Sequence, residues 1–101
     1  MNGRGGHKGL HPLQGERAPI RAEETPVGAG NWPRFAVFAD GEEEFSRMTA
    51  KYPDLLELSL RKPYQAGGLW VVRPDGYVAL ATRAGDWEAV AEYFKRIAKS
   101  A

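Results

Sequence analysis

The feature that most constrains the fold is a pair of apolar runs on either side of the tetrapeptide Arg73-Pro74-Asp75-Gly76. Both runs are rich in β-branched and aromatic residues, which favour strands. Pro74 sets φ at about −65° at the first corner of a turn. Asp75 tolerates the second corner, and Gly76 accepts a positive φ. The sequence therefore predicts a β-hairpin closed by a type I turn and a glycine bulge.

Composition limits the kind of protein this chain can be. Its 101 residues are enough for one domain with a modest core. A formal net charge of +1 favours neither nucleic acid nor an anionic membrane as a partner. The absence of cysteine excludes disulfides, thiolate metal sites and cysteine-based catalysis. Because the sequence has no run apolar enough to span a bilayer and no hydrophobic signal core, we expect a cytoplasmic protein.

The first third of the chain shows no hydrophobic periodicity. Residues 1–10 are rich in glycine and are expected to form a disordered leader. Residues 11–32 are punctuated by proline and glycine, which indicates an extended arm lying across the rest of the domain, residues 33–101. His7 and His11 have no carboxylate or thiol at ligand spacing, so we interpret them as loop histidines and expect no metal site.

The first regular elements follow the arm. Residues 34–39 are apolar at consecutive positions, which indicates a central strand buried on both faces. Asp40 is the expected N-cap of a helix, with Glu43 completing a capping box. This helix should end near Lys51, because Pro53 disfavours the helical conformation just before it. We interpret the glutamates of its first turn as a solvated capping face rather than a catalytic or metal cluster.

A second strand and a last helix complete the expected elements. Residues 55–60 alternate, with Leu56, Leu58 and Leu60 expected to face the core. Asp86 is the expected N-cap of the last helix. Apolar residues recur in that helix at Trp87, Val90, Ala91, Phe94, Ile97 and Ala98. Their spacing is typical of a helix that packs one face on the core.

The order β-α-β-β-β-α predicts an α/β fold of minimal thioredoxin-like layout, a mixed four-stranded sheet in the order 2-1-3-4 preceded by the irregular arm. Both helices would then lie on one face of the sheet. Since two strands are apolar on both faces, either the arm or another protein must cover the second face. Residues 40–43, where a redox thioredoxin carries Cys-x-x-Cys, read Asp-Gly-Glu-Glu. Disulfide exchange is therefore excluded.

Two motifs resemble a known family. Residues 11–19 read HPLQGERAP and residues 72–79 read VRPDGYVA, both similar to the C-terminal domain of flavin-dependent aromatic-ring hydroxylases of the phenol and hydroxyphenylpropionate monooxygenase type. The similarity runs from about His11 to Ile97. It implies a thioredoxin-like domain without active cysteines that supports subunit association and packs against the hydroxylase body.

The family's catalytic and flavin-contacting residues lie in a portion that has no counterpart here, since no Gly-x-Gly-x-x-Gly follows a strand. No catalytic or cofactor-binding residue is therefore carried over to this chain. FAD is expected only in a partner or in a missing domain. Two origins stay open: a detached domain of a longer hydroxylase, or a free-standing relative of it.

Three functional hypotheses follow from these observations. The first is a non-catalytic module for dimerisation or for packing against a monooxygenase body, with Arg73, Asp75, Tyr77 and Trp70 as interaction residues. The second is a small-ligand or flavin-accessory protein that uses Trp32, Trp70 and Trp87 as stacking surfaces. The third is a small enzyme with a non-thiol site, for which the sequence offers only the two loop histidines.

Overall fold

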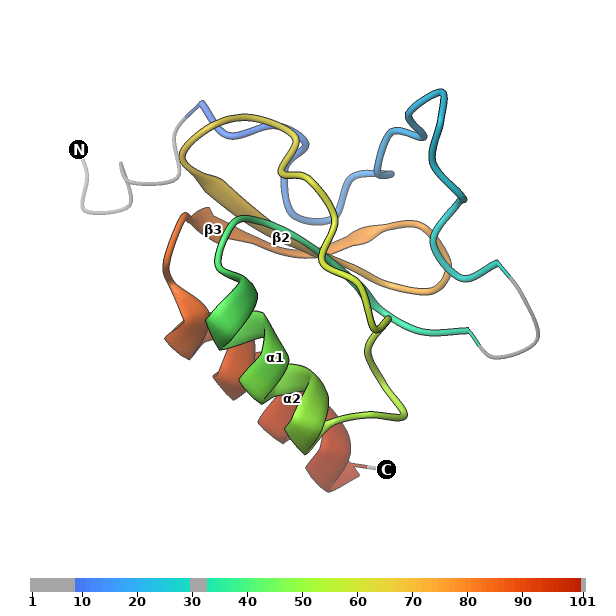
Figure 1. Cartoon of the computed structure of the whole chain (residues 1–101). Coiled ribbons are helices and arrows are strands. Elements are labelled where there is room, and N and C mark those ends of the chain that lie inside the picture. Colours follow the sequence, from blue (N-terminus) through green and yellow to red (C-terminus); the bar gives the residue numbers. More distant parts are fainter. Residues whose placement is uncertain (1–8, 30–32, 101) are drawn as a thin grey trace.

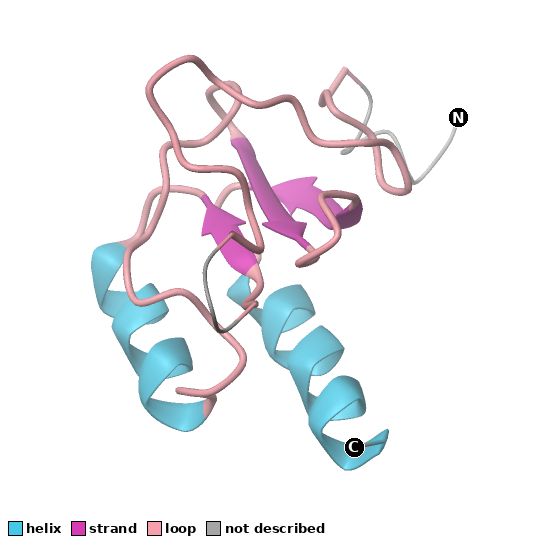
Figure 2. Cartoon of the chain, turned by 90° about the vertical axis from the view of Figure 1, so that its right-hand side faces the viewer, coloured by secondary structure: helices cyan, strands magenta, loops and turns pink. Residues whose placement is uncertain are grey.

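The computed structural model describes residues 9–29 and 33–100. It contains a three-stranded antiparallel sheet in the order β1-β2-β3 and two helices (Figure 1). The elements along the chain are β1 (Ala36–Phe38), α1 (Glu42–Lys51), β2 (Gly68–Val72), β3 (Val78–Arg83) and α2 (Trp87–Ser100). Figure 2 shows that long loops connect these elements, above all before β1 and between α1 and β2.

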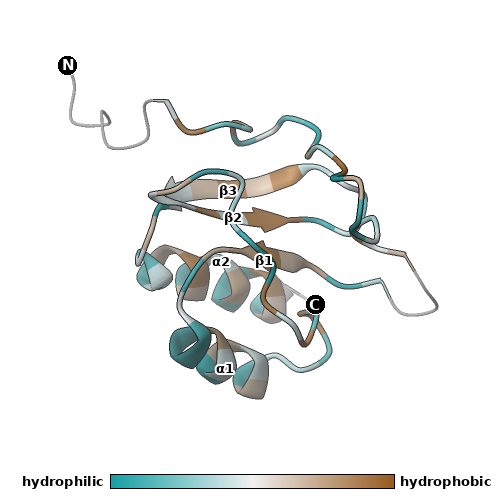
Figure 3. Cartoon of the chain, turned by 45° about the horizontal axis from the view of Figure 1, so that its top comes forward, coloured by the Kyte–Doolittle hydropathy of each residue, from teal (hydrophilic) through white to brown (hydrophobic). Residues whose placement is uncertain are grey.

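The molecule has three layers. Both helices lie on one face of the sheet, as the order of elements predicts, and the N-terminal arm crosses the other face (Figures 1 and 3). Side chains alternate along each strand, so the sheet contributes to a core on either side. Val37 and Val71 face the helices, whereas Phe38 and Trp70 face the arm. β1 is thus buried on both faces as expected, but the prediction that it is the central strand is wrong: β1 lies at the edge of the three-stranded sheet and β2 at its centre.

The two cores lie on opposite faces of the sheet and pack against different segments. The core on the helix face contains Val37, Ala39, Phe45, Met48, Leu56, Leu69, Val71, Val90 and Phe94. The core on the arm face contains Leu10, Ala18, Ala36, Phe38, Trp70, Val72, Val78 and Ala81. Leu10 and Ala18 of this second core come from the N-terminal segment that precedes β1. The second face is therefore covered by the protein itself, the first of the two covers that the sequence left open.

Backbone pairing fixes the arm to β3. The Gly15 N–H donates to the Val78 carbonyl oxygen at 2.8 Å, and the Val78 N–H donates to the Glu16 carbonyl oxygen at 2.8 Å. The Ala18 N–H donates to the Gly76 carbonyl oxygen, also at 2.8 Å. Leu10, the last residue of the expected leader, is buried, and residues 1–8 of that leader lie outside the described residues. Residues 15–18 of the arm thus pair alongside the outer edge of the hairpin.

The hairpin has the turn that the sequence predicts. The Gly76 N–H donates to the Arg73 carbonyl oxygen at 2.8 Å, which closes a four-residue turn. Gly76 has φ 92°, a left-handed conformation that glycine adopts without a Cβ penalty. The pairing register shifts between Val71 and Val72. The predicted glycine bulge lies at Gly76 itself, where the Arg73 N–H donates to the Tyr77 carbonyl oxygen at 2.8 Å, and the register shift is a separate irregularity farther along the strands.

The helix starts differ in how well the sequence predicts them. The cap of α1 at Asp40 is wrong: the N-cap is Gly41, in a left-handed conformation, and no side chain caps the helix. The Gly41 carbonyl accepts the first helical hydrogen bond, from the Phe45 N–H at 3.0 Å. The cap of α2 is confirmed, because the Ala89 N–H donates to Asp86 Oδ1 at 3.3 Å. The cap at Asp86 depends only on neighbouring residues, so the sequence predicts it. The start of α1 at Gly41 depends on packing against Trp87, which is distant in sequence.

The expected strand over residues 55–60 forms only two isolated parallel bridges, Phe35 with Leu56 and Phe38 with Arg61. From the first bridge to the second, the chain advances three residues along β1 (35 to 38) but five along the opposite segment (56 to 61). The longer segment must therefore bulge outward. Leu58 lies in the bulge and is 74% exposed, so its expected inward orientation is wrong. The four-stranded sheet and its thioredoxin-like order are not confirmed.

Candidate association surface and arm contacts

The hairpin tip carries an ion pair between Arg73 and Asp75. Arg73 Nε donates to Asp75 Oδ1 at 3.1 Å, and a second guanidinium nitrogen contacts the other carboxylate oxygen. The Tyr77 N–H donates to Asp75 Oδ1 at 3.2 Å, which ties the pair to the turn. The hydrogen bond with Arg73 lowers the pKa of Asp75, and the same bond raises the pKa of Arg73. The two side chains, 48% and 50% exposed, are both accessible and held in place.

Two guanidinium groups lie close to the ring of Tyr77. The Arg17 guanidinium carbon lies 4.8 Å from the ring centroid, and that of Arg73 lies 5.9 Å from it. Arg17 Nη2 also donates to the Tyr77 hydroxyl oxygen at 3.3 Å. Arg17 comes from the arm, 60 positions before Tyr77, so no local pattern predicts that it joins the hairpin tip. We call Arg17, Arg73, Asp75 and Tyr77 the tip cluster.

Trp70, the fourth residue assigned to the interaction surface, lies elsewhere. Its side chain is 0% exposed, and its Nε1 donates to the Pro12 carbonyl oxygen at 2.8 Å. The ring of Tyr64 packs edge-on against it, with centroids 5.4 Å apart. The structure thus gathers Arg73, Asp75 and Tyr77 at the tip and places Trp70 in the core beneath the arm.

Arg21 clamps the arm to the loop that follows Arg61. Its Nε and Nη2 donate to the two carboxylate oxygens of Glu24 at 3.0 and 2.8 Å. Its Nη2 also donates to the Lys62 carbonyl oxygen at 2.7 Å, and its Nη1 to the Pro63 carbonyl oxygen at 3.2 Å. The guanidinium lies over the Tyr64 ring, 4.8 Å from its centroid. A single arm residue therefore combines an ion pair, two carbonyl contacts and a cation–π contact.

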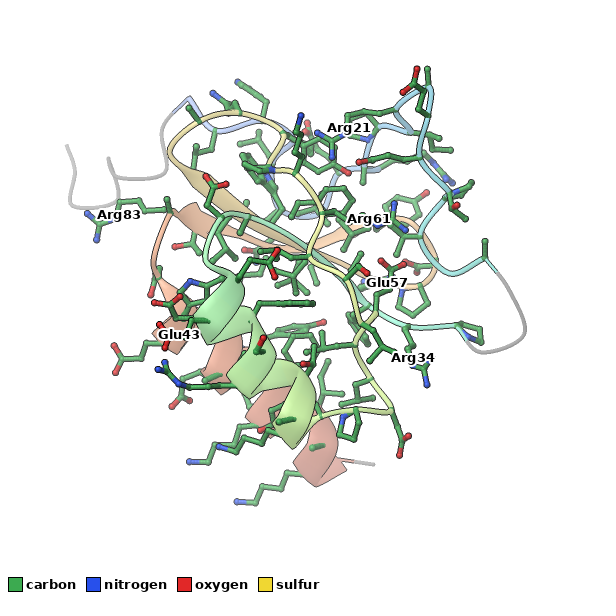
Figure 4. The ribbon with its side chains drawn as sticks, in the orientation of Figure 1. Arg21, Arg34, Glu43, Glu57, Arg61 and Arg83 are labelled. Carbon is green, nitrogen blue, oxygen red and sulfur yellow. The ribbon has the colours of Figure 1, made fainter. Side chains whose placement is uncertain are left out.

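Arg61 makes the reciprocal contact from the body to the arm. Its Nη1 donates to the Thr25 carbonyl oxygen at 2.6 Å, while its Nε and Nη2 bind Glu57 at 2.8 Å each. The hydrogen bond to Glu57 is the main reason why the pKa of Arg61 is raised. In Figure 4, Arg21 lies beside the arm, Arg61 and Glu57 lie below it on the segment that follows α1, and Glu43 lies in the first turn of α1. We call the Arg21 and Arg61 contacts the arm clamp.

The tryptophans proposed as stacking surfaces do not form one surface. Trp70 belongs to the core on the arm face, whereas Trp87 packs against the core on the helix face. Trp32 and His7 lie outside the described residues. The backbone N–H of His11 donates to Gln65 Oε1 at 2.7 Å. Within residues 9–29 and 33–100, no group of three or more His, Asp or Glu side chains is arranged to hold a metal ion.

These contacts define a small α/β domain in which ion pairs hold the hairpin tip and the arm. Residues 26–101 match the family model of the phenol hydroxylase C-terminal dimerisation domain, and the chain belongs to this family. The family resemblance is thereby confirmed; of the two motifs that suggested it, residues 72–79 lie within the match and residues 11–19 precede it. The match begins at Pro26, so most of the arm precedes it.

The other comparisons add no relative. No curated protein and no solved structure matches the chain. Neither helix in the described part of the chain is long and apolar enough to cross a membrane.

Proposed function

We propose that this chain is a non-catalytic module through which an enzyme of the phenol hydroxylase type self-associates. The observation that carries the proposal is the match of residues 26–101 to the dimerisation domain of that family. A dimerisation role is consistent with the charged clusters of the described residues, because these clusters form ion pairs within the domain. Self-association needs a complementary surface, not a reactive group.

The tip cluster is the surface we assign to self-association. The arm covers the second face of the sheet, so that apolar face is not available to a partner in this conformation. Arg73 and Asp75 stand side by side and half exposed at the tip. In a two-fold dimer, Arg73 of one copy can face Asp75 of the other and the reverse. Tyr77 adds the kind of aromatic contact that is enriched at interfaces.

Charge reversal tests this surface. We expect the wild-type chain to dimerise at about 100 µM, a concentration at which even weak interfaces are populated. Arg73→Glu and Asp75→Arg should each shift the solution mass toward the monomer, because like charges then face each other across the interface. Mixing the two variants should restore the dimer, since the opposite charges face each other again. The measurement is sedimentation velocity of each variant and of the mixture.

The matched control is Arg83→Glu, because Arg83 is also exposed and lies at the far end of β3 from the hairpin tip (Figure 4). It changes the net charge as Arg73→Glu does and should leave the dimer intact. A wild-type chain that stays monomeric contradicts self-association. A dimer that Arg73→Glu and Arg83→Glu affect equally contradicts the tip as its surface. Circular dichroism checks that each variant is folded.

Further parts of the proposal rest on the family likeness. This chain carries no flavin, and FAD belongs to a partner or to another part of the enzyme. Titrating the chain into FAD should therefore leave the flavin fluorescence unchanged. We also propose that the domain is thioredoxin-like in origin; the parallel bridges of Phe35 with Leu56 and of Phe38 with Arg61 support this. Its place of action is the cytoplasm.

A further inference from the structure

The arm contacts a part of the body that is distant from it in sequence. Among the described residues, the hydrogen bonds between the arm and the body end on residues 61–78. None of these bonds makes use of the chain that connects the arm to β1. The same bonds would therefore form if the arm belonged to a second copy of the chain.

The arm leaves the body at the hairpin tip. A Cβ built on Gly28 would lie 1.9 Å from the Pro74 carbonyl oxygen, so the two backbones are in direct contact. Pro74 lies between Arg73 and Asp75 of the tip cluster. In a dimer that associates through the tip cluster, the place where each arm leaves its own hairpin is therefore close to the other copy.

The connection between the arm and β1 is longer than the distance between its two ends. Ala36 of β1 pairs with Val72, two residues before Pro74, so Gly28 and Ala36 lie within roughly 15 Å of each other. The chain from residue 28 to residue 36 can span about 26 Å when extended. This excess lets the arm reach the hairpin of a second copy that it meets at the tip.

The tip cluster alone is small for a long-lived dimer. Stable interfaces bury about 800 Å² and involve about 20–30 residues on each partner, far more than the side chains of this cluster provide. If the arms are exchanged, dissociation must also remove Ala18 from the core on the arm face and separate Pro12 from the Trp70 indole. Exchange therefore adds the buried contacts that the tip lacks.

We propose that two copies of this chain exchange their arms, so that each arm covers the sheet of the other copy. The proposal rests on the proposed self-association and names the segment that holds the two copies together. Exchange leaves the number of arm contacts unchanged, so the tip contacts still determine how much dimer is present at equilibrium. Exchange slows dissociation, because both arms must be released before the copies separate.

Two engineered cysteines distinguish an exchanged arm from an arm on its own body. The backbone N–H of His11 donates to Gln65 Oε1 at 2.7 Å, and both residues are exposed. The chain has no cysteine of its own. The variant that combines His11→Cys with Gln65→Cys, treated with a short bismaleimide at about 100 µM, should give crosslinked species of twice the chain mass. Crosslinks confined to single chains would overturn the exchange.

Mixtures of single variants show which residues are joined between copies. His11→Cys and Gln65→Cys, refolded together from urea, should crosslink to each other, whereas each variant alone should not. The matched control pairs His11→Cys with Lys99→Cys, because Lys99 is exposed on α2 and has no contact with the arm. Equal crosslinking in the control mixture would mean random collision and would contradict the exchange.

A paramagnetic label gives a second measurement that does not depend on crosslinking. A nitroxide is attached to the His11→Cys variant, which is then refolded with ¹⁵N-labelled wild-type chain. Exchange should broaden the amide signals of Gln65 and Ala66 in the labelled wild-type copy. In a tip dimer without exchange these amides stay sharp, because Gln65 precedes β2 and the hairpin tip follows its other end.

Sedimentation velocity separates failure of this proposal from failure of self-association. A dimer in which Gln65 stays sharp and crosslinks remain within single chains contradicts arm exchange and leaves self-association standing. A chain that stays monomeric at about 100 µM contradicts both. A dimer with crosslinks between copies supports both.

Discussion

The indole Nε1 of Trp70 donates a hydrogen bond of 2.8 Å to the carbonyl oxygen of Pro12, 58 positions earlier in the chain. Trp70 is in the central strand and Pro12 is in the arm, so this bond joins the middle of the sheet to its cover. Both residues are buried. A buried N–H without a partner destabilises the folded state, so Trp70 specifies where the arm must lie.

Replacing Trp70 should therefore loosen the arm as well as the core. Trp70→Phe removes the indole donor and part of a fully buried ring, and we expect the free energy of unfolding to fall by about 2–4 kcal/mol. Urea denaturation measures this change. Amide exchange of Gly15 and Ala18, whose N–H groups pair with the hairpin, should become faster. Unchanged exchange at these two amides would show that the arm is held without Trp70.

The arm clamp should contribute more than an ordinary surface ion pair. Arg21→Met keeps most of the side-chain bulk but removes the contacts with Glu24, Lys62 and Pro63, and we expect a loss of about 1–2 kcal/mol. Arg47→Met is the matched control, because Arg47 is mostly exposed and lies 3.7 Å from the Glu43 carboxylate. It should cost less than about 0.5 kcal/mol. Chemical denaturation compares the two, and equal losses would contradict the clamp.

Gly28 should be intolerant of any side chain. Its φ is 87°, and a Cβ placed there would lie 1.9 Å from the Pro74 carbonyl oxygen, which is backbone and has little freedom to move. Gly85 has nearly the same φ of 84° but no atom within 4 Å of such a Cβ. Gly85→Ala should thus cost only the left-handed strain of about 1 kcal/mol, and Gly28→Ala clearly more. Thermal unfolding of both variants tests this, and equal shifts in Tm would contradict a close approach of the arm to the hairpin.

Stability should fall at high pH because of Tyr64. An unfolded tyrosine ionises near pH 10, whereas burial raises the pKa of Tyr64 in the folded protein to about 12. Between these values the unfolded chain releases a proton that the folded chain keeps, so the free energy of unfolding decreases as the pH rises. The contribution is complete below about pH 10 and is lost through about pH 12.

Tyr64→Phe provides the comparison for this pH dependence. The variant has no hydroxyl to ionise, so its loss of stability between about pH 10 and pH 12 should be smaller than that of the wild type. Urea denaturation at several pH values measures both. Identical slopes would show that Tyr64 does not carry the effect. The pKa of Tyr93 is also raised by burial, so a residual slope is expected in the variant.

The sequence predicts best where a few neighbouring residues decide the backbone. The hairpin turn depends on Pro74, Asp75 and Gly76, and its geometry is present as expected. The cap at Asp86 and the inner face of α2 depend on residues within one or two helical turns. The tip residues Arg73 and Asp75 also meet because two positions separate them. In each case the interacting residues are close in sequence, so a short sequence pattern is enough to predict the interaction.

Long-range contacts decide what the sequence leaves open. Arg21 reaches carbonyl oxygens 41 and 42 positions away, and Arg61 reaches Thr25 across 36 positions. No periodicity encodes such pairs, so the sequence shows that the second face needs a cover but not which one. Leu58 and Gly41 differ from expectation for the same reason: the bulge beside β1 and the approach of Trp87 are set by packing.

The sequence by itself determined the hairpin, the two helices, the lack of thiol chemistry and the likeness to hydroxylase dimerisation domains. Only the tertiary structure decided that the arm covers the sheet, that Trp70 is core and that Arg17 joins the hairpin tip. The physical reason is one of range. Turn and helix preferences act over a few residues, whereas burial of an apolar face requires whichever distant segment also satisfies its hydrogen bonds.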